Sequence, residues 1–475
     1  MKKLLLLSAL LIFACSSDDS TSDDSNDNNN NNNNPSNCDV VYLDDNGITI
    51  KACDDAVVGE SGIVNGVEYT VVDRAMLVDI IADGYNLTTI CTSRVVDMTN
   101  LFYNQVVSQD LRTWDLSNVT DMSYMFTGST YANNMEFSNY TYWDVSNVTS
   151  MTALFAGHRF NYPFEENSFD NWDVSNVTDM SGMFAESTQV QFTPSIENWD
   201  VSSVTNMSYM FNNLGYVTGG SLVGDLSNWD VSNVTDMSEM FGHVDLAYNI
   251  RITGIENWDV GSVTNMSHMF AGGDTPEFQT RLNFDFSSWD VSNVTDMTGM
   301  FTYCYFGNSS TGGNVEPVEP VEPGIGNWDV SSVTDLTDMF YSSNFNGPIG
   351  DWDVSNVTSM SRMFGYSPIS GGFGSFQSAA SSEFELFNQD ISSWDVSNVT
   401  QMASMFLRNF RFNQDLSSWD VSNVITMSSM FYTYNGYGYF PQDFSNWNVT
   451  NVTNCNNFDD YRTQFTPPTF TNCTP

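Results

Sequence analysis

Eleven aspartates each follow a tryptophan directly, and their carboxylates are the side chains of this chain with the clearest potential for chemistry. Only the twelfth tryptophan is followed by an asparagine, Asn448. Hard cations such as calcium bind carboxylate and carbonyl oxygens, so a column of these aspartates would be able to hold successive metal ions. The weak candidates for such a calcium ladder are Asp173, Asp200, Asp230 and Asp259. The full set is Asp115, Asp144, Asp173, Asp200, Asp230, Asp259, Asp290, Asp329, Asp353, Asp395 and Asp420.

A turn-forming role explains the same aspartates without a metal. Aspartate often accepts hydrogen bonds from backbone N–H groups two or three residues further along, in an Asx-type turn. If repeats stack at a strand spacing of about 5 Å, neighbouring carboxylates repel by about 0.8 kcal/mol in water, and such hydrogen bonds would offset that repulsion. The chain has no Asp-x-Asp-x-Asp-Gly loop, and Asn448 can make the same turn without charge. These features favour the turn and predict no cofactor, with calcium left as the alternative.

The histidines give little support for catalysis. His158, His243 and His268 lie just after or within a Met-Phe segment or its equivalent, and no nucleophile or acid recurs beside them. A repeated structural aspartate is also a poor glycosidase residue, because its neighbours are the same in every unit. We therefore predict no catalytic residues and no enzymatic activity.

Tandem repeats are the elements that must position these side chains. The shortest unit is the 24 residues from Trp328 to Trp352, and longer units carry their extra residues after the Met-Phe pair and before the next tryptophan. Insertions at one loop position place the loops along one side of an array. Because a unit that cannot bury its apolar face alone must stack on its neighbours, the repeats predict a solenoid. The tryptophans lie at positions 114, 143, 172, 199, 229, 258, 289, 328, 352, 394, 419 and 447.

Two hydrophobic periodicities meet inside each unit. Apolar and polar residues alternate around the tryptophan, which predicts a short extended segment. Val119, Met122, Met125 and Phe126 then follow a spacing of three, three and one, which is typical of one face of a two-turn helix. Asn118 is interpreted as the helix N-cap, since serine takes its place in other units. Each unit is thus predicted to contain an extended segment, a turn and a short helix.

The repeat resembles that of a known bacterial family. Segments 387–400 and 412–424 share the phrase Phe-Asn-Gln-Asp-x-Ser-Ser-Trp-Asp-Val-Ser-Asn-Val. This phrase is similar to the repeat of BspA-like leucine-rich-repeat surface lipoproteins. The resemblance implies an α/β repeat solenoid, an irregular leucine-rich-repeat-like array of short extended segments and short helices. It also implies adhesion at the cell surface, and it supplies no catalytic residues.

The resemblance covers residues 93–458, which contain twelve tryptophan units and one degenerate leading unit at 95–102. Residues 1–14 are predicted to be a lipoprotein signal peptide, with Cys15 as the lipid attachment site. Residues 15–37 are Ser, Asp and Asn almost throughout and are predicted to be a disordered tether. Acidic residues just after Cys15 resemble a surface-export signal. The expected location is the outer membrane at the cell surface, with membrane contact only through the N-terminal lipid.

The chain ends are predicted to be caps. Residues 38–92 have an ordinary globular composition, with strands expected at 40–43 and 67–72, hairpin turns at two Asn-Gly pairs and a helix over 73–83. This small α/β region would cover the N-terminal end of the solenoid; an independent binding domain is the alternative. Residues 459–475 cannot continue the repeat and are expected to form the C-terminal cap.

Cysteine usage agrees with export. Seven cysteines become six once Cys15 carries a lipid, and an even number in an exported protein predicts disulfides. The local pairs expected are Cys38 with Cys53, and Cys455 with Cys473. The pairing of Cys91 and Cys304 is left open.

Charge excludes one class of partner. The chain has 13 Lys plus Arg against 58 Asp plus Glu, a formal net charge of -45. A field of that sign repels nucleic acid and anionic lipid surfaces. It is compatible with cationic partners, with bridging cations, or simply with a solvated acidic surface.

The inserted loops are the places where the repeat changes, so they are the first candidates for binding. One loop is rich in aromatic residues that could stack on sugar rings or peptide, although their pattern favours packing over the edge of the array. The predicted function is a surface adhesion or interaction protein that binds an extracellular protein or polysaccharide through the solenoid face and its loops. The alternative is a structural envelope spacer or stalk without a selective ligand. The candidate loop residues are Tyr432, Tyr434, Tyr437, Tyr439 and Phe440.

Overall fold

The computed structural model divides into two compact units, Met1–Cys38 and Asp39–Pro475, and almost all residues that it describes belong to the second. The predicted signal peptide, the tether and Cys15 lie outside the described residues. Within the described part of the chain, no helix has the length and apolar character needed to span a membrane. The described residues are 38–131, 140–159, 169–187, 195–214, 222–244, 250–273, 280–306, 323–367, 386–433, 440–459 and 464–475.

The N-terminal region contains small sheets and one α-helix, close to the predicted positions. Asp73 caps the helix by accepting a hydrogen bond from the Met76 N–H. Asn65 and Gly66 both have positive φ, as an Asn-Gly hairpin turn requires. β1 pairs with β2, and β3, β4 and β5 form a second sheet in that order. The elements are β1 (Val41–Leu43), β2 (Ile50–Ala52), β3 (Ser61–Val64), β4 (Val67–Val71), α1 (Arg74–Ala82) and β5 (Ile90–Cys91).

This N-terminal region packs directly against the first repeats. The Ile50 N–H donates to the Thr113 carbonyl at 2.9 Å. The Arg74 guanidinium donates to the carbonyls of Asp97 and Thr99 at 2.9 and 2.8 Å. Buried Leu77 of α1 belongs to the same hydrophobic core as the repeats. The region therefore extends the core of the array.

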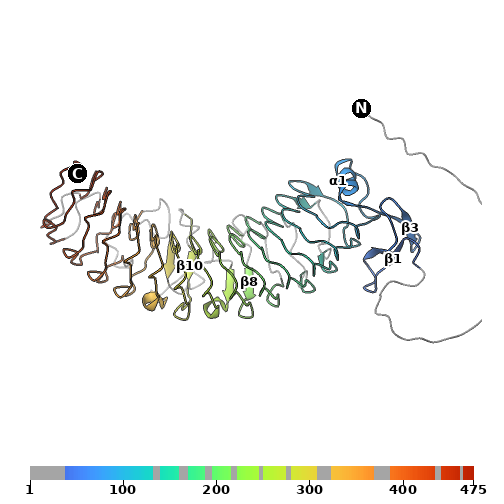
Figure 1. Cartoon of the computed structure of the whole chain (residues 1–475), viewed down its shortest axis with the longest axis horizontal. Coiled ribbons are helices and arrows are strands. Elements are labelled where there is room, and N and C mark those ends of the chain that lie inside the picture. The colour runs from blue at the N-terminus through green and yellow to red at the C-terminus, as the bar shows by residue number, and fades with distance from the viewer. Residues whose placement is uncertain are drawn as a thin grey trace, which may run out of the picture. The chain divides into compact units, whose positions relative to one another are not determined.

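Each repeat forms one coil, meaning the chain from one tryptophan to the next, and consecutive coils lie side by side (Figure 1). Parallel bridges join equivalent residues of neighbouring coils, from Asp97 with Asp121 to Thr426 with Asn454. Short strands pair between neighbouring coils in the same parallel sense. These strands are β6 (Val106–Val107), β7 (Thr130–Tyr131), β8 (Leu222–Asp225), β9 (Ile250–Thr253), β10 (Thr280–Leu282) and β11 (Cys304–Phe306), and two short 3-10 helices are η2 (Ile255–Asn257) and η4 (Ile325–Asn327).

The core of the array is a set of stacked columns of identical side chains. Every repeat tryptophan is buried, and from Trp143 onward its ring N–H donates to the carbonyl three residues before the preceding tryptophan. Trp229 is 4% exposed and donates to the Ile196 carbonyl at 2.9 Å. Phenylalanines stack from coil to coil, as Phe241 does on Phe270 with ring centroids 5.8 Å apart. Burial of each tryptophan thus depends on its neighbours.

Polar side chains form ladders on the outside of the same coils. The side-chain amide of Asn147 donates to the Ser117 carbonyl at 2.7 Å, and the hydroxyl of Thr149 donates to the Thr120 carbonyl at 3.1 Å. The predicted N-cap role of Asn118 is therefore wrong, because its amide donates to the Ser93 carbonyl of the previous coil at 2.9 Å. Asparagine at this position links coils.

The short helices predicted within the repeats are also wrong. From Met122 onward the N–H groups alternate between two kinds of acceptor. Met122 donates to the Ser150 carbonyl of the next coil at 3.0 Å, whereas Met125 donates three residues back to Met122 at 3.2 Å. Tyr124 has φ 60°, which an α-helix does not allow. Consecutive β-turns bury their first and fourth residues, and this reproduces the spacing that resembled a helix.

Candidate binding face

Two β-turns follow one another in each coil and present side chains in a fixed way. In the first coil with a tryptophan, the Met125 N–H closes the turn on the Met122 carbonyl, and the Ser129 N–H closes the next turn on the Phe126 carbonyl. The third residue of each turn has positive φ, 60° at Tyr124 and 63° at Gly128. A positive φ at the third residue alone is the geometry of a type II turn.

The third residue of the first turn forms a column whose chemistry changes from coil to coil, and we call it the variable column. Its residues all have φ between 49° and 61°. The backbone is therefore constant where the side chain is not. The variable column is Asn100, Tyr124, Ala153, Gly182, Tyr209, Glu239, His268, Gly299, Asp338, Arg362, Ser404, Ser429 and Asn457.

Neighbouring coils hold this column in its left-handed conformation. The N–H groups of Tyr209, His268 and Arg362 donate to carbonyls of the next coil at 2.8, 2.7 and 2.9 Å. A side chain in the left-handed region costs roughly 1 to 2 kcal/mol, so only glycine would be expected if backbone preference decided the residue. Most coils carry another residue, and the inter-coil hydrogen bonds stabilise it there.

The N-terminal half of the variable column exposes tyrosine beside acid. Tyr209 is 45% exposed, and Tyr124 is similarly exposed. The Asn212 amide donates to the Glu239 carboxylate at 2.9 Å. Partial burial raises the pKa of Tyr209, and the charge and hydrogen bond of Glu239 raise it further.

The C-terminal half contains an arginine fixed between an acid and a ring. The Arg362 guanidinium forms an ion pair with the Asp338 carboxylate and lies 5.4 Å from the centroid of the Tyr341 ring. Tyr341 in turn meets Tyr303 edge to face, with centroids 5.7 Å apart. Arg362 remains 51% exposed, whereas Asp338 is 13% exposed. We call Tyr303, Asp338, Tyr341 and Arg362 the Arg–Tyr patch.

The carboxyl of Asp338 is held in an environment unlike that of the other acids. Burial raises the pKa of Asp338, and the charges of Arg362 and His268 only partly oppose it. Its Oδ1 has no hydrogen-bond partner among the described residues. The His268 ring lies across Gly299, since a Cβ at that glycine would be 2.5 Å from its Nε2. Glycine at 299 therefore leaves room for the histidine ring.

The aspartates that follow the tryptophans form Asx turns. Each of the four weak calcium candidates accepts the N–H of the second residue further on, at 3.1 Å, through its Oδ1. Asp200 also accepts the Ser202 hydroxyl at 2.6 Å, and these bonds lower its pKa. Within the described residues, no cluster of three or more histidines, cysteines or acids is arranged to hold a metal. The candidates are Asp173, Asp200, Asp230 and Asp259.

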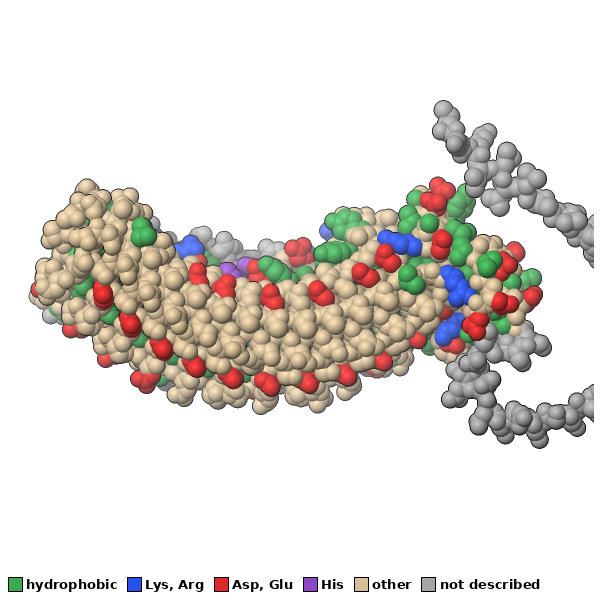
Figure 2. Space-filling model, in the orientation of Figure 1, with side chains coloured by type: hydrophobic (Ala, Val, Ile, Leu, Met, Phe, Trp, Pro, Cys, Tyr) green, Lys and Arg blue, Asp and Glu red, His purple; other side chains and the backbone are tan. Residues whose placement is uncertain are grey.

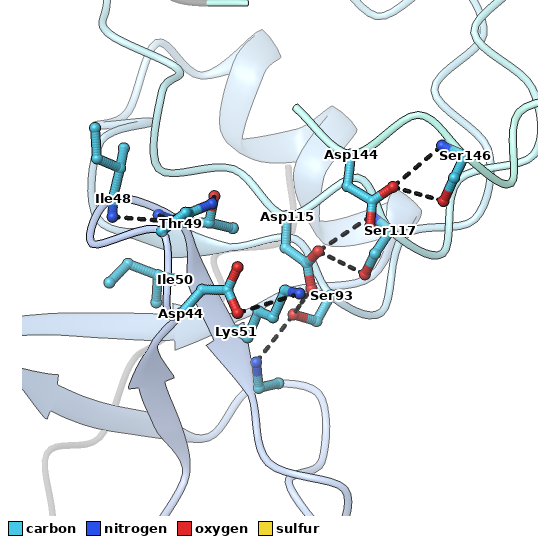
Figure 3. A network of polar contacts seen from close by, with 12 residues as sticks. Asp44, Ile48, Thr49, Ile50, Lys51, Ser93, Asp115, Ser117, Asp144 and Ser146 are labelled. Carbon is cyan, nitrogen blue, oxygen red and sulfur yellow. Dashed lines mark hydrogen bonds and ion pairs between the residues drawn. The ribbon is translucent and has the colours of Figure 1, made fainter. Parts of the chain in front are cut away.

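The first of the aspartates that follow the tryptophans is Asp115, which lies beside the N-terminal region and differs from the others (Figure 3). Asp115 is buried and accepts hydrogen bonds from the hydroxyls of Ser93 and Ser117. Lys51 forms an ion pair with Asp44 at 3.4 Å. Burial alone would lower the pKa of Lys51, but the charges of Asp115 and Asp44 outweigh it and the pKa is raised.

Acidic side chains form a regular row along one edge of the array (Figure 2). Basic side chains in this view lie near the N-terminal region and, away from it, on the opposite edge. Further acidic side chains lie near that opposite edge, beside the basic ones (Figure 2).

The predicted aromatic loop is only partly described. Tyr434, Tyr437 and Tyr439 lie outside the described residues. Phe440 is buried against Phe431 and Phe465, with centroids 5.1 and 5.3 Å away, so its predicted role as an exposed ligand contact is wrong. It serves the alternative role, packing at the end of the array. Tyr432 is half-buried, and its N–H donates to the Ser429 carbonyl at 3.3 Å.

The cysteines divide into bonded and free groups. Cys455 and Cys473, an expected pair, form a disulfide. Cys38 and Cys53 are both disulfide-bonded. Cys91 and Cys304 are free and buried. Burial raises the pKa of both thiols.

Sequence reasoning did not identify the variable column or the Arg–Tyr patch. The usable signal was the x in Asp-Met-Ser-x-Met-Phe, since this is the position where an otherwise fixed phrase accepts Tyr, Gly, Glu, His or Arg. His268 belongs to the variable column, whereas His158 is fully buried, and burial lowers its pKa to about 3.

Comparison with known proteins gives one family. A family model described as "Mycoplasma protein of unknown function, DUF285" matches the chain repeatedly and covers more than half of it. No curated protein and no solved structure matches. Overlapping matches along one chain are the result expected from tandem repeats. The matched residues are 76–167, 130–217, 158–249, 216–322, 315–369 and 376–469.

Proposed function

This chain belongs to the DUF285 family, and we propose that it is a cell-surface adhesion or interaction protein that binds an extracellular protein or polysaccharide. The variable column and the inserted loops beside it would form the binding face. The observation that carries this proposal is the combination of constant backbone and changing side chains in the variable column. The tryptophans, which only build the array, are the same residue in every coil.

The proposal includes the anchoring and the class of fold expected from the sequence. In it, Cys15 carries a lipid, residues 15–37 tether the array, and the protein is displayed on the outer membrane. The array is an irregular leucine-rich-repeat-like solenoid related to BspA-like surface lipoproteins, without catalytic activity. Support comes from the lipobox-like N-terminus and from parallel bridges that join one coil to the next.

The test replaces the exposed members of the variable column without disturbing its backbone. Tyr124, Tyr209, Glu239 and Arg362 are changed together to serine, the residue that Ser404 and Ser429 already place at the same φ. Binding of the full chain to arrays of extracellular proteins and polysaccharides is then measured. We expect binding to disappear while the thermal midpoint changes little.

The matched control changes four exposed ladder residues outside the variable column. Thr149, Thr178, Thr205 and Thr235 are changed to serine, which retains the hydroxyl that donates to the neighbouring coil. This variant should bind as the parent does. Loss of binding in the control, with binding retained in the column variant, would place the binding face on the ladders instead.

A structural spacer is the second candidate function. The asparagine and threonine ladders link most consecutive coils and would stiffen the array regardless of any ligand. If the parent chain binds none of the arrayed proteins or polysaccharides, the spacer function is favoured and the adhesion proposal fails.

A further inference from the structure

We propose that the Arg–Tyr patch, extended by Tyr366 of the same coil as Arg362 and by Arg408 of the next coil, binds consecutive acidic sugar units of a uronate-bearing polysaccharide. This inference rests on the proposed binding function and assigns it a ligand class. Arginine would bind the sugar carboxylates and tyrosine rings would pack against the sugar rings.

The first support is a local concentration of arginines. The chain carries a formal net charge of -45, yet Arg362, Arg408 and Arg411 lie within 50 residues. The only other basic residues between Trp114 and Trp447 are Arg159, Arg251 and Arg281. An anionic polymer is repelled by most of this surface, so it would be bound where arginines gather.

The second support is the fixed position of Arg362. Asp338 and the Tyr341 ring hold its guanidinium from two sides, although half of the side chain is exposed. Asp338 is the only side-chain or backbone acceptor for this guanidinium among the described residues. Guanidinium carries five N–H donors in a planar fork that matches a carboxylate. An arginine already held in place loses less conformational entropy when it binds.

The third support is a second arginine and tyrosine from adjacent coils. The Tyr366 N–H donates to the Leu407 carbonyl at 2.7 Å, which places Tyr366 beside the residue that precedes Arg408. Arg362 with Tyr341 and Arg408 with Tyr366 therefore give two arginine and tyrosine pairs from adjacent coils. A polymer with one carboxylate on each ring can use both pairs at once, which increases its apparent affinity.

The variable column beyond Asp338 also lacks acid. Arg362 is followed by Ser404, Ser429 and Asn457, whereas Glu239 precedes the patch. The N-terminal half of the same column carries Glu239 and no arginine, so it offers a polyuronate no guanidinium to bind. This difference predicts binding at one end of the column only.

The test measures binding of polygalacturonate, a uronate polymer, to the full chain by titration calorimetry. Arg362→Gln should raise the dissociation constant by at least about tenfold, equivalent to 1.4 kcal/mol. Arg408→Gln should have an effect in the same direction. The matched control is Arg112→Gln, since Arg112 is also an exposed arginine in an ion pair, with Asp110 at 2.6 Å, but lies at the other end of the array. The dissociation constant of the Arg112→Gln variant should stay within about twofold of that of the parent chain.

Three outcomes would overturn the inference. The ligand class is wrong if the parent chain binds poly-glutamate or a neutral β-glucan but not polygalacturonate, and the proposed binding function then still stands. The site is wrong if polygalacturonate binds equally to the parent and the Arg362→Gln variant. Absence of binding to polygalacturonate and to every arrayed protein and polysaccharide would remove both proposals together.

Discussion

The ladders and the variable column are both built from one residue per coil, yet they use polar side chains in opposite ways. In the ladders, the side chains of Asn147 and Thr149 donate hydrogen bonds to carbonyls of the preceding coil. In the same coil, the Oδ1 of Asp144 accepts a hydrogen bond within its own turn. In the variable column, the backbone makes the inter-coil bonds and the side chain is left to differ. Identity between repeats therefore accompanies contacts that hold the coils together, and we propose that variation on constant geometry marks the surface used for recognition.

Electrostatics separates the same two regions. Hydrogen bonds from Ser202 lower the pKa of Asp200 in the ladder region. Burial raises the pKa of Asp338 in the variable column. The first carboxylate is stabilised as an anion by the fold, and the second is not. The acid at position 338 is therefore better explained by its ion pair with Arg362 than by a contribution to the stability of the fold.

The largest expected effect removes a side chain on which both regions depend. Trp229→Ala should lower the free energy of unfolding by about 3 to 5 kcal/mol, because it deletes a buried aromatic and leaves a cavity between coils. The measurement is urea unfolding followed by circular dichroism. Trp447→Ala in the last coil should cost less, since fewer coils depend on it. A loss below about 1 kcal/mol at Trp229 would mean that the column of tryptophans does not hold the coils together.

A smaller effect is expected from the asparagine ladder. Asn233→Ser removes the amide that donates to the Ser202 carbonyl at 2.8 Å and should cost about 1 kcal/mol. The reverse change, Ser203→Asn, should stabilise the array because it adds a rung that this coil lacks. Both are read from the urea midpoint. Equal midpoints for the two variants would contradict a structural role for the ladder.

The pKa shifts predict opposite pH dependence for two aspartates. The lowered pKa of Asp200 gives stability that is present above the unfolded value near 3.8 and lost as pH falls through the folded value. The raised pKa of Asp338 gives stability that is present below 3.8 and lost as pH rises through the folded value.

Asp200→Asn should therefore lower the free energy of unfolding more at pH 7 than at pH 3. The free energy of unfolding of Asp338→Asn, relative to the parent, should be higher at pH 7 than at pH 3. The test is the unfolding free energy of both variants and the parent across this range. The same sign of pH dependence for both variants would show that the two regions do not differ in this way.

The sequence predicted the repeat register and, in the N-terminal region, the strands β1 and β4 and the helix α1, because each rests on a local pattern. It predicted helices around Met122 and Met125 wrongly, since consecutive β-turns bury residues at nearly the same spacing. The equivalence of Tyr209, Gly299 and Arg362 is readable from their shared position in the repeated phrase, but their side chains have no chemistry in common. Their shared positive φ and the hydrogen bonds between coils appear only in the structure.

The smallest expected effect sharpens the comparison most. Tyr209→Ser changes an exposed ring at a position where serine occurs natively in other coils, so the free energy of unfolding should move by no more than about 0.5 kcal/mol. Asn233→Ser alters a neighbouring coil with the same replacement residue and should cost about twice that. If Tyr209→Ser proves the more damaging of the two in the same urea titration, the variable column is structural, and recognition must then be sought on the ladders.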